Sequence, residues 1–168
     1  MLLQRIIGVF KLDVDNFEEI EADESATTQA AMVVLLVALL AGIGRGFVGY
    51  GDSSFIGGFL SAFISTFIGW IVWSAATYFV GTSLFGGNAD MGQMLRVIGF
   101  AFSPQLLGII PCVGAVVGAI WTLVAGFIAV RQGLDLDNTK AFLTILVGLI
   151  VYLALNFVLN LVLGPIGL

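Results

Sequence analysis

The stretch FIGGFLSAFISTFIGWIVWSAATYFV, residues Phe55–Val80, contains no charged side chain. A helix of roughly 20 apolar residues is long enough to cross the hydrocarbon core of a bilayer, and this stretch exceeds that length. Its few polar groups, including Ser61, Ser65 and Thr66, can form hydrogen bonds with neighbouring helices when water is absent. The stretch therefore predicts a transmembrane helix.

The composition of the whole chain agrees with that assignment. Of 168 residues, 60% are hydrophobic and 10% are charged, whereas an ordinary soluble domain carries about 25% charged residues. The net charge of −5, without a basic stripe, argues against nucleic-acid binding. Histidine is absent and Cys112 is the single cysteine, which excludes an internal disulfide and a Cys/His zinc site. We predict an integral membrane protein without a cofactor or metal.

Four further apolar stretches surround the first one. We expect helices at Ala30–Gly44 (extending to Gly49 if Arg45 snorkels), Leu95–Ile110, Val113–Val130 and Ala141–Leu163. The predicted fold is an all-α polytopic membrane bundle of about five transmembrane helices. Two arrangements remain open for the third and fourth stretches, because Pro104 interrupts the third: two full crossings or a re-entrant hairpin.

The first residues form a different kind of helix. On a helical wheel, the apolar residues of Met1–Lys11 fill one arc, while Arg5, Lys11 and the other polar residues fill the opposite arc. Such a helix suits the surface of an anionic membrane; the alternative is that it packs on the protein's own spans. Residues 13–24 are rich in acids and predict a solvated linker with another short helix, beginning near Asp15 with a capping-box-like partner at Glu18.

Basic residues predict the orientation of the bundle. With a cytoplasmic N-terminus, only Arg45 among the six basic residues lies outside, which obeys the positive-inside rule. We therefore expect a multi-pass protein of the inner (cytoplasmic) membrane. The basic residues expected on the cytoplasmic side are Arg5, Lys11, Arg96, Arg131 and Lys140.

Several positions within or beside the predicted spans carry polar or conformational signals. Asn156 and Asn160 share one face of the last span and either bond between helices or line a polar path. Pro104 and Gln105 mark a break in the third span, which is either a kink or a binding site. Arg96 either snorkels or pairs with Asp90, or else binds a lipid phosphate or an acidic partner. Candidate positions for close helix packing are Gly114 and Gly118.

A resemblance emerges around the third span. The segments MLRVIGFAFSP and GLDLDNTKA, with the leading IGVFKLDVDNFEEIEADESATTQA, resemble the Yip-domain family of Ypt/Rab-interacting membrane proteins, and its prokaryotic branch in particular. Gly99, Phe100 and Pro104 match that family's Gly-aromatic-x-x-x-Pro element. The resemblance implies a five-span bundle with a cytoplasmic N-terminus. On this basis residues 1–28 form the cytoplasmic N-terminal segment and residues 29–168 the membrane domain.

The resemblance leaves the activity open. Its eukaryotic members are linked to vesicle trafficking, but this chain lacks their long N-terminal tail and shows no DLYGP-like element. No acid lies within the predicted spans and no histidine can serve as a base, so we expect no catalytic residues. We favour a non-enzymatic protein that organises the membrane or recruits partners, with the lipid bilayer, other membrane proteins or a second copy as its contacts.

Two alternatives stay open. A small transporter, channel or lipid-moving protein would need a polar cavity reaching Asn156, Asn160 or Pro104. Asp90, Asp135 and Asp137 all belong to loops on the cytoplasmic side, where they would bind a hard cation only if the fold brought them together.

Overall fold

The computed structural model describes residues 1–48, 55–110 and 113–163, and the side chains of all of these except 48 and 155–163. The described part is helical and contains no strand. Its elements are α1 (Leu2–Phe10), α2 (Val14–Ala22), α3 (Ala26–Val48), α4 (Phe55–Phe85), α5 (Met91–Ala101), the 3-10 helix η1 (Ser103–Ile109), α6 (Val113–Gly133) and α7 (Asn138–Leu163).

Three helices of the described part, α3, α4 and α6, are long and apolar enough to cross a membrane. The described portion of α7, Asn138–Ala154, is also apolar but shorter. Large apolar side chains such as Phe47, Ile56 and Leu123 are 80%, 67% and 71% exposed along these helices. Because a soluble monomer does not expose such a continuous apolar surface, the predicted all-α membrane bundle is confirmed.

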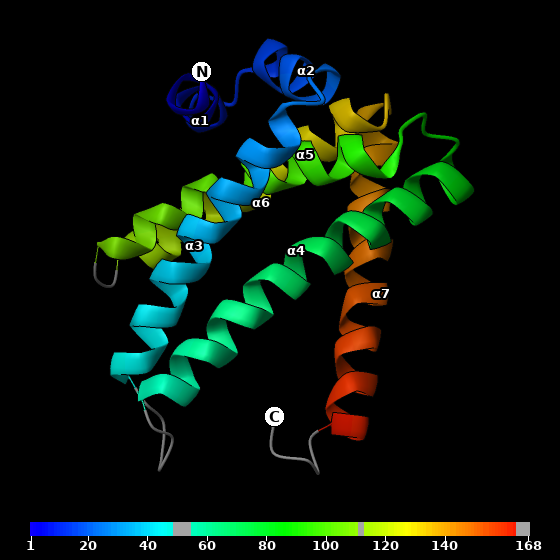
Figure 1. Cartoon of the computed structure of the whole chain (residues 1–168). Helices are drawn as coiled ribbons and strands as arrows, with labels where there is room; N and C mark the ends of the chain where they lie inside the picture. Colours follow the sequence, from blue (N-terminus) through cyan, green and yellow to red (C-terminus); the bar gives the residue numbers. More distant parts are fainter. Residues whose placement is uncertain (49–54, 111–112, 164–168) are drawn as a thin grey trace.

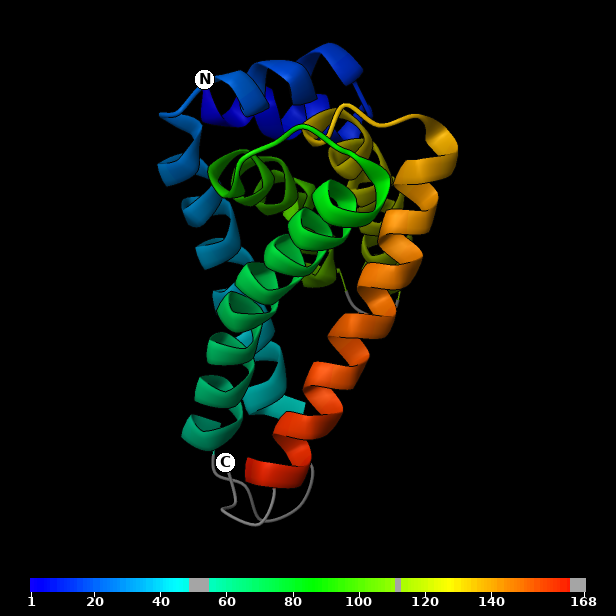
Figure 2. The ribbon, with the colours of Figure 1, turned by 90° about the vertical axis from the view of Figure 1, so that its right-hand side faces the viewer.

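The helices form a bundle with one capped end (Figure 1). α1 and α2 lie across the end where α3 begins, while α3, α4 and α7 extend away from it. α5 and η1 run beside α6 as a tilted hairpin that turns before it reaches the far ends of α3 and α4, in both Figure 1 and Figure 2. The sequence left a re-entrant hairpin and a pair of full crossings open for these segments, and this arrangement resembles the hairpin more closely.

Local sequence signals determine where the short helices begin. Asp13 caps α2, since its Oδ1 accepts a hydrogen bond from the Asp15 backbone N–H at 3.2 Å. The prediction that the cap lies at Asp15 with Glu18 is therefore wrong by two residues. A capping box does occur at α5, where Asp90 and Gln93 exchange hydrogen bonds of 2.8 and 2.5 Å between side chain and backbone.

The buried core lies at the capped end of the bundle. Phe17 and Ile20 of α2 are completely buried there, together with Phe100 of α5. Further along, α3 and α4 remain in contact through a row of aromatic rings on α4, which includes Phe59 and Phe63 with centroids 5.9 Å apart. The capped end is therefore held by protein packing, whereas much of the remaining helical surface is available to lipid.

Candidate functional site

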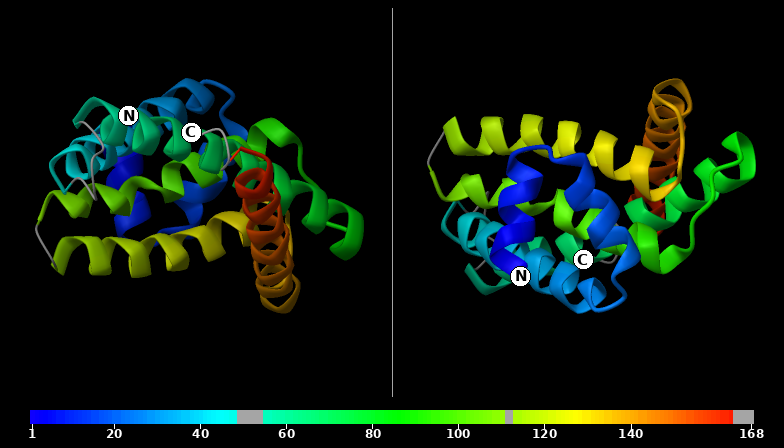
Figure 3. Two further views of the ribbon diagram at one scale, coloured as in Figure 1. Left: turned by 90° about the horizontal axis from the view of Figure 1, so that it is seen from below. Right: turned by 90° about the horizontal axis from the view of Figure 1, so that it is seen from above.

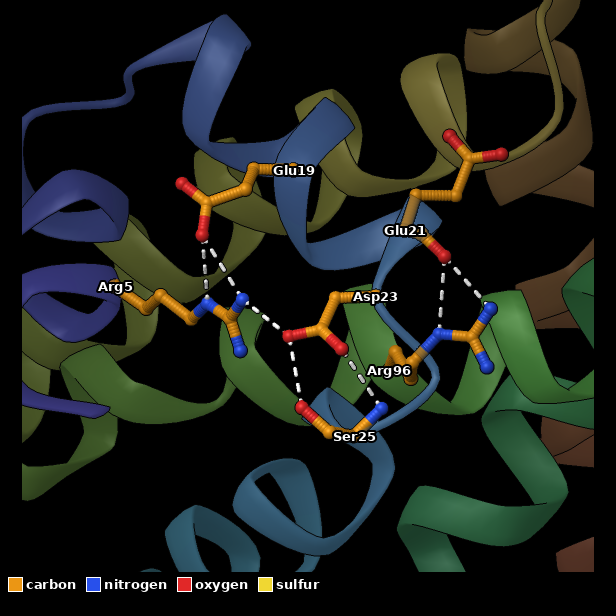
Figure 4. Close-up of polar contacts among 6 residues, drawn as sticks. All are labelled: Arg5, Glu19, Glu21, Asp23, Ser25 and Arg96. Atoms are coloured by element: carbon orange, nitrogen blue, oxygen red, sulfur yellow. Dashed lines mark hydrogen bonds and ion pairs between the residues drawn. The ribbon is translucent and has the colours of Figure 1, made fainter. Parts of the chain in front are cut away.

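Arg96 of α5 holds the end of α2. Its Nη2 and Nε donate to the carbonyl oxygen of Glu21 at 2.6 and 3.0 Å (Figure 4). Its Nη1 donates to Thr27 Oγ1 at 3.4 Å. The last carbonyls of a helix have no partner within it, and the helix dipole favours a cation at that end. Arg96 is only 6% exposed. It therefore neither snorkels nor pairs with Asp90, whose carboxylate caps α5 instead.

Arg5 joins α1 to α2 and to the turn that follows. Its Nη2 lies 2.9 Å from Glu19 Oε1 and 2.6 Å from Asp23 Oδ2, and the arginine is 4% exposed (Figure 4). Asn16 adds a hydrogen bond of 3.1 Å to the Arg5 carbonyl oxygen. We call α1, α2 and the turn at Asp23–Ser25 the N-terminal platform. Both ion pairs of the platform involve Arg5, which the helical wheel places on the polar arc of α1.

Asp23 is the most strongly stabilised carboxylate of the platform. Hydrogen bonds from Ser25, through both its hydroxyl and its backbone N–H, and from Arg5 lower the pKa of Asp23 to about 2. Hydrogen bonds to the ionised form are the physical cause. The turn between α2 and α3 therefore keeps its negative charge at neutral pH.

Glu21 has the opposite electrostatic environment. Burial, followed by repulsion from Asp135 and Glu18, raises the pKa of Glu21 to about 7. Its Oε1 accepts a hydrogen bond of 2.8 Å from Gln93 Nε2 on α5. Glu21 therefore combines a structural contact between α2 and α5 with a charge that changes close to neutral pH.

The platform also contacts α6. Trp121 Nε1 donates to the carbonyl oxygen of Phe10 at 3.0 Å, and Gln132 Nε2 donates to Glu18 Oε1. Seen from above, α1 and α2 lie over the α5–α6 pair (right panel of Figure 3). The platform is thus connected to both arms of the hairpin, α5 and α6.

The capped end presents an acidic surface. Both Arg5 and Arg96 are buried: Arg5 pairs with acids inside the platform, and Arg96 donates to the end of α2 from below, so neither presents its charge at the surface. Lys11 and Lys140 are exposed there, but acids outnumber them. The exposed acids of this end, among the described residues, are Asp13, Asp15, Glu18, Glu19, Glu24, Asp90, Asp135 and Asp137.

The apolar arc of α1 is divided between two environments. Val9 is fully buried against the bundle, and Leu2 and Ile6 pack on the same core. Leu3 and Ile7, one helical turn apart, remain 68% and 44% exposed. One side of α1 thus packs on the protein's own helices, and a second side is free to contact lipid or a partner.

In the family-like motif of the third span, Gly99 and Phe100 lie where helices pack closely. A Cβ atom at Gly99 would lie 2.8 Å from Ala30 Cβ and 3.1 Å from Trp70 Nε1, so α3 and α4 both approach α5 at this glycine. Trp70 Nε1 donates to the Leu95 carbonyl oxygen at 3.0 Å. Phe100 is fully buried. The three helices therefore meet closely at Gly99.

Pro104 lies at the start of η1 and faces α6. A Cβ atom at Gly118 would lie 2.7 Å from the Pro104 carbonyl oxygen, and one at Gly114 would collide with the Leu107 carbonyl oxygen. The absence of side chains at both glycines lets the 3-10 segment lie directly against α6. The break at Pro104 thus shapes the hairpin.

A cleft of two lobes lies beside the hairpin. One lobe, of about 400 Å³, is bounded by α4, α5, η1, α6 and α7, and the other, of about 540 Å³, by α3, η1 and α6. Both lobes are lined by Gln105, Thr122 and Leu123. We call this space the hairpin cleft.

Among the described residues, the remaining positions predicted from the sequence belong neither to the platform nor to the hairpin cleft. The side chains of Asn156 and Asn160 lie outside the described residues, so their role remains a prediction. Asp137 caps α7 by accepting from the backbone N–H groups of Thr139 and Lys140 at 2.9 Å. Within the described ranges, no group of three or more acids, cysteines or histidines is placed to hold a metal ion.

Sequence reasoning missed Glu21, Trp121 and the internal role of Arg5. The available signal for Arg5 was charge complementarity: a lone arginine on an amphipathic helix precedes an acidic helix carrying Glu19 and Asp23. No sequence pattern pointed to Arg96 and the Glu21 carbonyl oxygen, because they are far apart in the chain and one partner is a backbone atom.

Comparison with known proteins identifies a single family. A family model described as the Yip1 domain matches residues 7–159. The match therefore runs from within α1 to residue 159 of α7, and it includes most of the platform, α3, α4 and the hairpin. The searches of curated proteins and of solved structures found no match.

Proposed function

Because this chain belongs to the Yip1-domain family, we propose that it is a non-enzymatic protein of the inner membrane that recruits a partner through its N-terminal platform. The observation that carries the proposal is the way the platform is held. Arg5 and Arg96 bind it from within, and the acidic residues remain outside. A preorganised surface of this kind costs little conformational entropy when a partner binds.

The charge of the platform indicates the kind of partner. Exposed acids such as Asp15 and Glu24 favour a basic protein surface and disfavour direct contact with anionic lipid headgroups. The exposed apolar pair Leu3 and Ile7 would supply an adjoining hydrophobic contact, with the partner or with the membrane surface. A second copy of this chain is a less suitable occupant, because its own platform would carry the same negative charge.

The orientation belongs to the same proposal. Arg96, Arg131 and Lys140 lie at the platform end of the bundle, whereas Arg45 is in the last turn of α3, at the opposite end. The positive-inside rule therefore supports a cytoplasmic platform. In that position it would meet soluble or membrane-bound partners of the cytoplasm.

Photo-cross-linking in the producing cell tests recruitment. Benzoylphenylalanine is introduced at Asp15 or Glu24, and at lipid-facing Ile64 or Leu153 as matched controls. We expect discrete protein adducts from the platform positions, which weaken when nearby Glu18 is changed to lysine. Platform adducts no stronger than those of the controls would refute recruitment, and adducts of twice the chain's mass would indicate self-association instead.

Cysteine labelling tests the orientation. In a Cys112→Ala background, Ser25→Cys should react with a membrane-impermeant maleimide only after the inner membrane is permeabilised. Asp52→Cys, between α3 and α4 in the sequence, should react in spheroplasts without permeabilisation. The reverse pattern would overturn the proposed sidedness.

A further inference from the structure

We propose that the hairpin cleft binds an uncharged lipid with two acyl chains, of the diacylglycerol type, whose ester carbonyl and hydroxyl groups bond to the side-chain amide of Gln105. Lipid binding there is independent of partner recruitment by the platform, because no residue of α1 or α2 lines either lobe. Seen from below, no helix of the described part crosses beneath α6 (left panel of Figure 3).

The lining of the cleft excludes a charged headgroup. No aspartate, glutamate, lysine or arginine lines either lobe. A phosphate or an ammonium group held there would lack a counter-charge in an apolar environment, which is strongly unfavourable. Most lining side chains are apolar, such as Leu40, Leu123 and Leu149. An uncharged amphiphile satisfies both conditions.

Gln105 supplies the polar contact. Its half-buried side chain lines both lobes and forms no hydrogen bond among the residues that the structure describes. An amide without a partner in hydrocarbon is costly, so a bound group that both accepts and donates would be favoured. An ester carbonyl accepts from the amide NH₂, and a glycerol hydroxyl donates to the amide oxygen. Thr122 also lines both lobes, although its hydroxyl is itself buried and has no partner in the described part of the chain.

The shape of the cleft matches two chains that diverge from one polar point. The lobes share Gln105, Thr122 and Leu123 and then separate, one toward α3 and the other toward α4 and α7. Gly44 lines the lobe toward α3, and Gly126 lines the lobe toward α4 and α7. A Cβ atom at either glycine would meet nothing within 4 Å. Each lobe thus has open space for an acyl chain.

The experiment uses the full chain in phosphatidylcholine proteoliposomes. Dioleoylglycerol with a diazirine on one acyl chain is photolysed, and the labelled peptides are mapped by mass spectrometry. We expect labelling of peptides from η1 and α6, and competition by unlabelled dioleoylglycerol. Gln105→Leu should reduce that labelling about fivefold, which corresponds to about 1 kcal/mol for one neutral hydrogen bond.

Two kinds of variant make the result specific. Gly126→Leu and Gly44→Leu fill the lobes without meeting protein atoms, so they should abolish labelling while the purified chain remains monodisperse. Gln29→Leu makes the same chemical change on α3 outside the cleft and should leave labelling unchanged.

Three outcomes would overturn the proposal. They are labelling that Gln105→Leu does not reduce, equal labelling of the same peptides by a diazirine-bearing phosphatidylglycerol, and labelling of η1 and α6 peptides that unlabelled dioleoylglycerol does not compete away.

Discussion

Arg96 Nη2 lies 2.6 Å from the carbonyl oxygen of Glu21, and this contact ties the N-terminal platform to the membrane bundle. The two residues are 75 positions apart in the chain. Because the acceptor is a backbone atom at the end of α2, the contact depends on where that helix stops and not on the side chain of Glu21.

Arg96→Lys should loosen the platform. Lysine keeps the charge but cannot donate two hydrogen bonds from a planar fork, so the change should cost about 1.5–3 kcal/mol of docking free energy. Hydrogen–deuterium exchange in detergent should accelerate in peptides from α1 and α2 and remain unchanged in α4. Arg131→Lys, whose partners are the side chains of Gln132 and Asn138, is the control. Equal acceleration in both variants would contradict the assignment.

The stability of the docked platform should depend on pH through Glu21. Its pKa rises from 4.5 to about 7 on folding, so the folded state binds the proton more strongly. The contribution of Glu21 to the free energy of unfolding is therefore greatest below pH 4.5, and it decreases as the pH rises from 4.5 to 7. Thermal unfolding of the wild type should show a lower midpoint at pH 7.5 than at pH 5.

Two variants separate Glu21 from its neighbours in that measurement. Glu21→Gln should flatten the slope between pH 5 and pH 7.5, whereas Glu24→Gln, at an exposed position, should retain it. The contribution of Asp23 falls in a different window, because its lowered pKa of about 2 makes stability decrease only as pH falls below 3.8. A wild-type slope in Glu21→Gln would rule out this residue as the source.

Gly118→Val should destabilise the hairpin. Its side chain would meet the Pro104 carbonyl oxygen, a backbone atom that cannot rotate away, so we expect a loss of about 1–3 kcal/mol. This corresponds to a decrease of several degrees in the unfolding midpoint. Gly126→Val, on the same helix but facing open space, is the matched control and should unfold near the wild-type temperature. Similar midpoints for the two variants would show that the stability of the hairpin does not depend on the absence of a side chain at Gly118.

Leu3 and Ile7 should contact the headgroup region of the membrane. With a nitroxide at Leu3→Cys or Ile7→Cys in a Cys112→Ala background, oxygen should relax the label more effectively than a water-soluble nickel complex. A label at exposed Glu24→Cys should show the opposite preference. If the labels at Leu3 and Ile7 also favour nickel, these side chains face water or a protein partner, and the membrane-surface role of α1 would be abandoned.

The sequence by itself determined the membrane fold, the family and the approximate helices. Apolar runs such as Phe55–Val80 leave few alternatives, because backbone groups in lipid must be satisfied within a helix. The family resemblance at Gly99–Pro104 is confirmed by the match over residues 7–159. Helix ends were less accurate: α4 continues to Phe85, and the third span divides into α5 and η1 at Phe102.

Only the tertiary structure decided how the polar residues are used. Arg5 and Lys11 share the polar arc of α1 in the sequence, yet one is buried in ion pairs and the other is exposed. Gln105 belongs to a break that the sequence leaves as either a kink or a binding site, and the fold places this residue at a cleft between distant helices. Hydrophobic periodicity is a local property of the chain, whereas the partner of a buried charge or amide depends on which helices pack against it. That choice is made by the three-dimensional packing of distant segments.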